Sequence, residues 1–248
     1  MNQESDSIED DKVEAQPELD LSLPVEQEIA RGDVNLKRFG NFIFPHHRTK
    51  NLNRRREFIS PVTLDNGRSA TQRIVIEPVV DGRAYTTFTQ RVYYALVLLW
   101  YERGSPDGWV RFSFRELARK LNIKESSWGG SIVTRLRREL DSLRKTNIDW
   151  FLSFESAEKQ RSTERGFHIL EEYEADSREQ KLADGRTAFE IDCAVRFNAR
   201  ILSNLQTVKT APLNFTALLS IKSSVAEMFY VRIDSILAQR PSYELTSI

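Results

Sequence analysis

The sequence has none of the long apolar runs that membrane segments or signal peptides require. Its longest apolar stretch, Val92 to Tyr101, is far shorter than the roughly 20 residues that cross a bilayer. No apolar run follows Met1, so no signal peptide is predicted. A single cysteine, Cys193, rules out a disulfide within one chain and favours a reducing compartment. We therefore expect a cytoplasmic protein that does not enter a membrane.

Motifs for catalysis and for metal binding are also missing. The sequence has no glycine-rich phosphate loop ending in Lys-Ser or Lys-Thr, and no His-hydrophobic-His pair of the kind that DNA-nicking enzymes combine with a catalytic Tyr. His46 and His47 are neighbours without Cys, Asp or Glu at ligand spacing, while His168 and Cys193 each stand alone in apolar alternation, which is typical of core residues. We therefore expect no enzymatic activity, no cofactor and no metal.

Charge is balanced overall but separated along the chain. Residues 1–33 hold eleven acidic side chains against Lys12 and Arg31, so the remainder has a net charge of +9. An acidic segment without helical or strand periodicity is typical of disorder, so residues 1–33 are predicted to be a disordered acidic tail. A basic body with an acidic tail favours nucleic-acid binding, although the tail could serve solubility alone.

One short stretch of this tail alternates polar and apolar residues. In an extended conformation Leu21 and Leu23 would lie on one side, where they could enter a hydrophobic groove. The stretch Leu21, Ser22, Leu23 and Pro24 resembles the peptides with which bacterial replication proteins bind the sliding clamp, with Asp20 in place of their leading Gln. The resemblance implies a clamp contact at these residues.

A basic segment, residues 34–72, follows the tail and is interpreted as an arm. Arg54, Arg55 and Arg56 are consecutive in it. Adjacent arginines on an extended arm can follow a DNA backbone without a fixed register, so we expect these three to contact phosphates. The alternative is that aromatic side chains pack the arm on the folded body while the arginines face water.

Residues 73–210 are predicted to form a winged helix-turn-helix domain of the α+β class. The pattern is strand, helix, strand, helix, helix and hairpin, which is the order of a winged helix. Ser113 followed by Glu116 is a capping box that opens the second helix. The expected elements are a strand at 73–80, helices at 87–103, 114–121 and 128–146, a strand at 109–112, a wing formed by 148–155 and 167–173, and a last strand at 187–197.

The third helix is the candidate for reading DNA, because this helix normally enters the major groove. Its predicted solvent face is basic and polar, and Gly129 and Gly130 would let the backbone approach a phosphate closely. Arginine can bond a guanine edge in bidentate fashion. The alternative is an ordinary charged helix face. The predicted DNA-contacting residues are Ser131, Thr134, Arg135, Arg137, Arg138 and Ser142.

The C-terminal residues 211–248 look like the beginning of a second winged-helix unit. A helix predicted at 222–239 has Val225, Phe229 and Ile233 on one side. Residues 242–246 parallel the strand at 109–113 and end on a capping residue in the same place. We expect either the start of a truncated second unit or a segment that buttresses the first.

From the tail peptide onwards, the chain resembles the TrfA-type plasmid replication initiators, a family of tandem winged-helix proteins. The resemblance is carried by the tail Leu-Ser-Leu peptide, the basic arm, and the segments 112–118, 221–230 and 243–245. It implies a homodimer that binds repeated sites in double-stranded origin DNA, opens the strands and recruits host proteins such as the sliding clamp and the replicative helicase.

Two other functions fit the same pattern. A winged-helix transcription regulator would bind a single palindrome, whereas an initiator would bind tandem direct repeats. A dimerisation or interaction module would show no salt-sensitive DNA binding at all.

Overall fold

Helix α3 (Thr87–Glu102) lies at the centre of the hydrophobic core. The computed structural model describes residues 28–49, 53–63, 69–78, 84–128, 130–151, 154–155, 161–162, 165–181, 187–207 and 210–237. The helix begins at a capping box, in which the Thr86 hydroxyl accepts from the Thr89 N–H and the Thr89 hydroxyl accepts from the Thr86 N–H. It ends before Gly104, whose φ of 77° is the left-handed conformation that glycine adopts freely. Among the described residues, no helix combines the length and apolar character that a membrane crossing needs.

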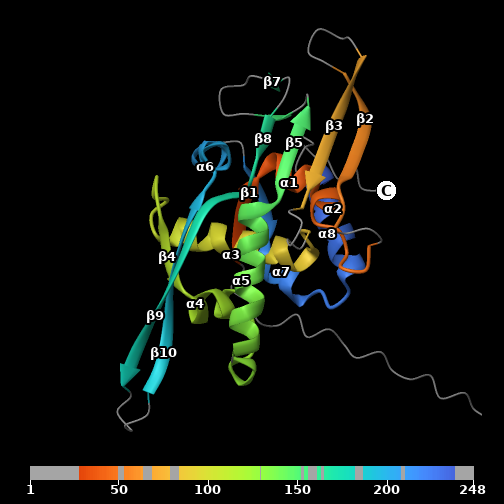
Figure 1. Ribbon diagram of the computed structural model, residues 1–248. Coiled ribbons are helices and arrows are strands. Elements are labelled where there is room, and N and C mark those ends of the chain that lie inside the picture. The colour runs from red at the N-terminus through yellow and green to blue at the C-terminus, as the bar shows by residue number, and fades with distance from the viewer. Residues whose placement is uncertain are drawn as a thin grey trace, which may run out of the picture.

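The fold is a winged helix-turn-helix of the α+β class, as the sequence predicts. Helix α3 is followed by a strand, two helices joined by a turn that contains a 3-10 segment, and a long hairpin, and the three strands form an antiparallel sheet of order β4-β10-β9. Figure 1 shows the β9–β10 hairpin extending away from the body beside α5. The elements are β4 (Val110–Ser113), α4 (Phe114–Lys120), η1 (Glu125–Ser127), α5 (Gly130–Lys145), β9 (Leu170–Lys181) and β10 (Thr187–Phe197).

The wing is not where the sequence analysis placed it. The first expected strand begins as β5, which lies in a second sheet of order β2-β3-β5-β8 and pairs Ile148 with Ile76. The second expected strand divides between β8, which pairs with β5 as predicted, and β9 of the wing sheet. The stretch predicted as one strand at 167–173 is interrupted, because the Ile169 N–H donates to the Leu143 carbonyl at the end of α5, 3.1 Å away. The wing is therefore the β9–β10 hairpin. The second sheet and a small adjoining ladder comprise β2 (Arg56–Thr63), β3 (Ser69–Glu77), β5 (Asn147–Phe151), β6 (Phe154–Glu155), β7 (Arg161–Ser162) and β8 (Arg165–Phe167).

The end of the predicted tail and the predicted arm are part of the fold. Strand β1 (Ile29–Asp33) pairs with β11 (Thr210–Asn214), and Asp33 then caps helix α1 (Val34–Arg38). A short helix, α2 (Gly40–Ile43), and strand β2 follow. These residues therefore form regular structure, in place of an irregular arm.

The described C-terminal residues buttress the winged helix. Helix α6 (Ala199–Gln206) leads into β11, and α7 (Phe215–Ser220) and α8 (Ser224–Leu237) follow. Helix α8 packs against α1, α2 and α3. The strand predicted at 242–246 lies outside the described residues, so the second winged-helix unit stays a prediction.

Candidate nucleic-acid interface

The turn between α4 and α5 has a fixed geometry. Asn122 adopts a left-handed backbone with φ of 53°, and the Ile123 N–H donates back to the Ala118 carbonyl at 3.0 Å. This arrangement ends α4 and satisfies its last carbonyls. The Trp128 indole N–H then donates to the Ile123 carbonyl at 3.0 Å, which ties the start of α5 to the end of α4. The two helices are held at one relative angle.

The N-terminal cap of α4 agrees in part with the predicted capping box. The Ser113 hydroxyl accepts from the Glu116 N–H at 3.1 Å, as predicted. The Glu116 carboxylate, however, pairs with the Arg103 guanidinium at 2.6 Å. Of the two hydrogen bonds in a capping box, the one accepted by Ser113 is therefore present. The Glu116 side chain binds Arg103 at the end of α3 in place of the second bond.

Helix α5 buries one face and presents its first half to solvent on the other. Leu136, Leu140 and Leu143 are buried in the core. Five of the six predicted DNA-contacting residues are exposed, so they could reach a ligand, and their role in DNA contact stays a prediction. They are Ser131, Thr134, Arg135, Arg137 and Arg138.

Ser142, the sixth predicted residue, is 3% exposed and cannot contact DNA in this conformation. The prediction was wrong because the second half of α5 enters the body of the domain. The Tyr85 hydroxyl donates to the Thr146 carbonyl at 3.2 Å, and the Thr89 hydroxyl donates to the Glu139 carboxylate at 2.6 Å. A face that is exposed at the start of the helix is covered at its end.

Aromatic rings hold two of the arginines on opposite flanks of α5. The Arg135 guanidinium carbon lies 3.6 Å from the centre of the Phe88 ring, on α3. The Arg137 guanidinium carbon lies 5.9 Å from the centre of the Phe114 ring, on α4. Such cation–π contacts orient a guanidinium while leaving its N–H groups free to donate.

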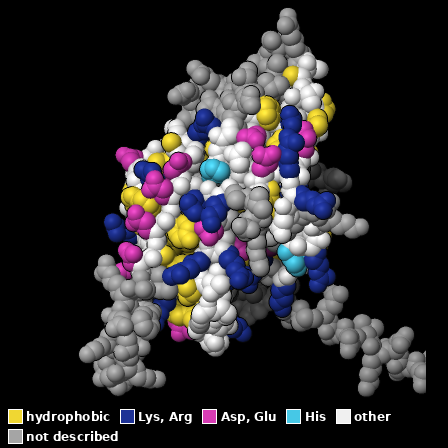
Figure 2. Space-filling view, viewed as in Figure 1, with side chains coloured by type: hydrophobic (Ala, Val, Ile, Leu, Met, Phe, Trp, Pro, Cys, Tyr) yellow, Lys and Arg dark blue, Asp and Glu magenta, His cyan; other side chains and the backbone are white. Residues whose placement is uncertain are grey.

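The helix-turn-helix as a whole is basic. Residues 114–145 contain nine Lys and Arg against four Asp and Glu, a net charge of +5. Figure 2 shows Lys and Arg gathered over the central helix region and Asp and Glu along the neighbouring hairpin edge. Exposed basic residues on α4 and in the turn add to the set and were missed, because the sequence analysis considered α5 alone. They are Arg115, Arg119 and Lys124.

The outer face of the wing sheet has four acidic side chains against two basic ones, Arg111 and Arg196, so it is acidic on balance. Glu172, Glu174 and Asp176 are exposed and alternate along β9, and Asp192 is paired with Asp176 on the neighbouring strand. Acidic side chains repel phosphate, so a bound duplex is expected to lie along α5, away from this face.

Buried Cys193 points toward the helices, and burial raises the pKa of its thiol to about 12, which leaves it an unreactive core residue. Within the part of the chain described, no cluster of three His, Cys, Asp or Glu could hold a metal ion.

The three arginines of the predicted arm differ in their surroundings. Arg54 and Arg55 are exposed, and the Arg55 Nε lies 3.0 Å from a Glu77 carboxylate oxygen. The Arg56 guanidinium donates to the Phe42 carbonyl at 2.7 Å, and burial lowers its pKa to about 10. Two of the Arg56 nitrogens therefore donate within the fold, and its contact with phosphate stays a prediction.

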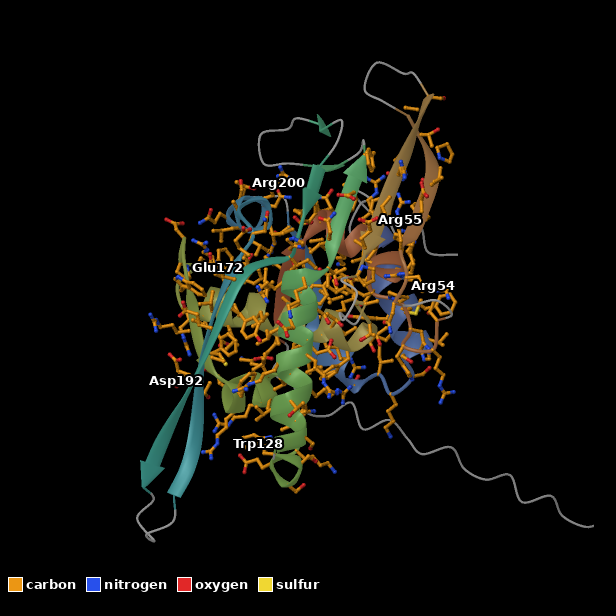
Figure 3. All side chains as sticks on the ribbon, viewed as in Figure 1. Arg54, Arg55, Trp128, Glu172, Asp192 and Arg200 are labelled. Atoms are coloured by element: carbon orange, nitrogen blue, oxygen red, sulfur yellow. The ribbon has the colours of Figure 1, made fainter. Side chains whose placement is uncertain are left out.

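Arg54 and Arg55 are also separated from the exposed half of α5. Figure 3 shows both residues on the other side of α5 from Glu172 and Asp192, with Trp128 at the start of the helix. Their contact with phosphate stays a prediction. The predicted clamp peptide, Leu21, Ser22, Leu23 and Pro24, lies outside the described residues.

Comparison with known proteins gives matches among solved structures alone. No family model matches the chain, and a search of curated proteins finds no match. A crystal structure of selenomethionine derivatives of domains 2 and 3 of RctB has a TM-score of 0.56 at 13% sequence identity, covering 84% of this chain and 71% of that chain. The fold resembles that of RctB domains 2 and 3. A second crystal structure of RctB domains 2–3 has a TM-score of 0.52 at 13% identity, covering 82% of this chain and 70% of that one.

Proposed function

We propose that this chain is a replication initiator that binds double-stranded origin DNA through α5, α4 and the turn between them. The exposed arginine cluster on the first half of α5 carries the proposal, because it occupies the place where winged helices enter the major groove. The similarity in fold to RctB domains 2 and 3 supports the winged-helix architecture on which the proposal depends. The role proposed is binding, without catalysis.

Each part of the surface has a distinct task in this proposal. Arg135 and Arg138 lie on the outward face of α5 and would bond base edges, for which a bidentate arginine discriminates by roughly 1–3 kcal/mol. Exposed Arg115 and Lys124 would contact phosphates and set the register of the duplex. The acidic outer face of the wing keeps DNA on the helix side.

The finer parts of the proposal rest on the resemblance to TrfA-type plasmid initiators. They are binding to repeated origin sites, assembly as a homodimer, contact with the sliding clamp through Leu21 to Pro24, recruitment of the replicative helicase, and action in the cytoplasm. Each of them predicts a separate interaction that can be measured with the whole chain.

The test is a DNA titration with charge-matched variants. Replacing Arg135 and Arg138 with Ala should weaken binding to the specific site by roughly 30-fold or more at moderate salt, because two base contacts are lost. A control that replaces Arg111 and Lys222 removes the same charge from exposed positions outside the cluster and should leave affinity within a few-fold. Equal affinity of both variants would contradict the role of α5.

Footprinting on the noncoding DNA of the native replicon then distinguishes an initiator from the two alternative functions, a transcription regulator and an interaction module. Protection of tandem direct repeats is expected. Protection of a single palindrome would instead identify a winged-helix transcription regulator, and absence of salt-sensitive binding would identify an interaction module.

A further inference from the structure

A groove of about 350 Å³ lies beside the helix-turn-helix, between α4 and α7. Glu28, the first residue that the structure describes, forms part of its wall. The other residues that line the groove come from α4, the turn after it and α7, and they are Arg119, Lys120, Asn122, Thr216 and Leu219. The described chain therefore begins next to the surface that we propose for DNA.

Three contacts fix Glu28 in this place. Its backbone N–H donates to the Thr216 hydroxyl at 3.0 Å, and its carbonyl accepts from the Phe215 N–H at 2.8 Å. Its carboxylate pairs with the ammonium of Lys120 on α4, which also binds Glu102 of α3. An acidic residue that belongs to the predicted tail thus binds a basic residue of the helix-turn-helix.

Around the groove the helix-turn-helix presents cations without carboxylate partners. Arginines elsewhere in the fold are often paired, as Arg55 is with Glu77. In the described part of the chain, no such pair is made by four exposed residues of α4, the turn and α5, which are Arg115, Arg119, Lys124 and Arg138. Unpaired cations gathered on one surface attract polyanions.

The residues that precede Glu28 have the opposite charge. Residues 1–27 contain nine Asp and Glu against Lys12, which is a net charge of −8, whereas residues 114–145 have a net charge of +5. The acidic segment is joined to the fold at the edge of the basic surface, through Glu28. Opposite charges at this separation attract one another, most strongly at low ionic strength.

We propose that the groove and the adjoining basic surface of α4 and α5 bind the acidic segment 1–27, which thereby covers the DNA-contacting surface when DNA is absent. The chain is long enough. Asp20 lies eight residues before Glu28 and can reach roughly 26–29 Å from it. The exposed first half of α5, residues 130–138, is only about 13 Å long. A tethered segment has an effective concentration in the millimolar range, so individually weak ion pairs suffice.

This contact would regulate DNA binding, so the inference rests on the proposed function for its effect. DNA has to displace the segment before it can bind. The apparent dissociation constant equals the intrinsic one divided by the fraction of protein that is competent to bind. A segment bound for nine-tenths of the time would therefore weaken binding to specific and to unrelated DNA by the same factor, about tenfold.

The first test locates the segment without DNA, so it does not depend on the proposed function. A nitroxide attached at Glu18→Cys in the full chain should broaden the amide signals of the α4–α5 turn and of the first half of α5. Cys193 is buried, so the label attaches at the new position alone. Signals of β2 should be spared, because Figure 1 shows this strand at the opposite end of the molecule from the turn. Uniform broadening, or none, would overturn the proposal.

The second test uses the full chain with the nine acidic residues of 1–27 replaced by Asn or Gln. With the same label, this variant should lose the broadening, because the charges that attract the segment are gone. It should also bind specific and unrelated DNA roughly tenfold more tightly at low salt, with an unchanged ratio between them. Persistent broadening in the neutralised variant would contradict attraction by charge. An unchanged DNA affinity would contradict competition with DNA, even if the label had located the segment on α5.

Discussion

The Asp33→Asn variant should gain stability relative to the wild type as the pH rises from about 4 to about 7. Asp33 is completely buried at the start of α1, where its carboxylate accepts from the N–H groups of Asn35 and Leu36 at 2.8 and 3.0 Å and from the Asn204 side chain at 2.7 Å. Burial raises the pKa of this carboxyl from 3.8 to about 6, and the hydrogen bonds only partly oppose the shift.

The sign follows from the direction of that shift. A carboxyl whose pKa is higher in the folded state binds protons more tightly there, so its contribution to stability is present below about pH 4 and is lost as pH rises through about 6. The change from 3.8 to about 6 corresponds to about 3 kcal/mol in full. Asn cannot ionise, and its carbonyl oxygen can still accept from both backbone N–H groups.

The assay is urea unfolding of both proteins, followed by tryptophan fluorescence at several values between pH 4 and pH 7. The difference between the free energies of unfolding of the variant and the wild type should move in favour of the variant by about 2 kcal/mol or more over this range. Other titrating groups cancel in that difference. A difference that is flat with pH, or that moves in favour of the wild type, would refute the argument that desolvation dominates at Asp33.

Two further predictions concern the interface and its support. Replacing Arg54 and Arg55 with Ala should flatten the slope of log DNA affinity against log salt concentration by up to roughly 0.9 per lost phosphate contact. Arg56→Ala should leave that slope unchanged. It should instead lower the free energy of unfolding by roughly 1–3 kcal/mol. An equal slope change for Arg56→Ala would contradict its structural role. Trp128→Phe keeps an aromatic ring, although a smaller one, and removes the indole N–H that donates to the Ile123 carbonyl. It should lower the free energy of unfolding by about 1 kcal/mol or more in urea titrations, and an unchanged midpoint would count against that bond.

Local signals in the sequence predict the helix-turn-helix well. The capping residue Ser113 begins the helix that it was expected to begin, and Leu136, Leu140 and Leu143 stand at helical spacing and form the buried face of α5. These features depend on neighbours within a few turns of helix, so the sequence contains all the information required.

Features that depend on distant residues were not predictable in this way. The segment at 148–151 pairs with β8, as a hairpin prediction allows, but its other partner is β3, some seventy residues earlier, which places it in a separate sheet. The apolar side of α8 is clear from the sequence, yet its direction is set by Arg91 and Lys37, which come from α3 and α1. Arg56 was assigned to DNA for the same reason, because the carbonyl groups that bind it are contributed by α2.

The pairing of β1 with β11 has a consequence for how the protein is made. Asp33 and Thr210 are register partners, so β1 cannot pair with its neighbour until residue 210 has been synthesised. At 5–20 residues per second, ribosomes need roughly 9–35 seconds to cover that interval. Helices α3, α4 and α5 are all synthesised within this interval, before β11 exists. Pairing of β1 therefore follows synthesis of the helix-turn-helix, and until then the strand has an unpaired edge.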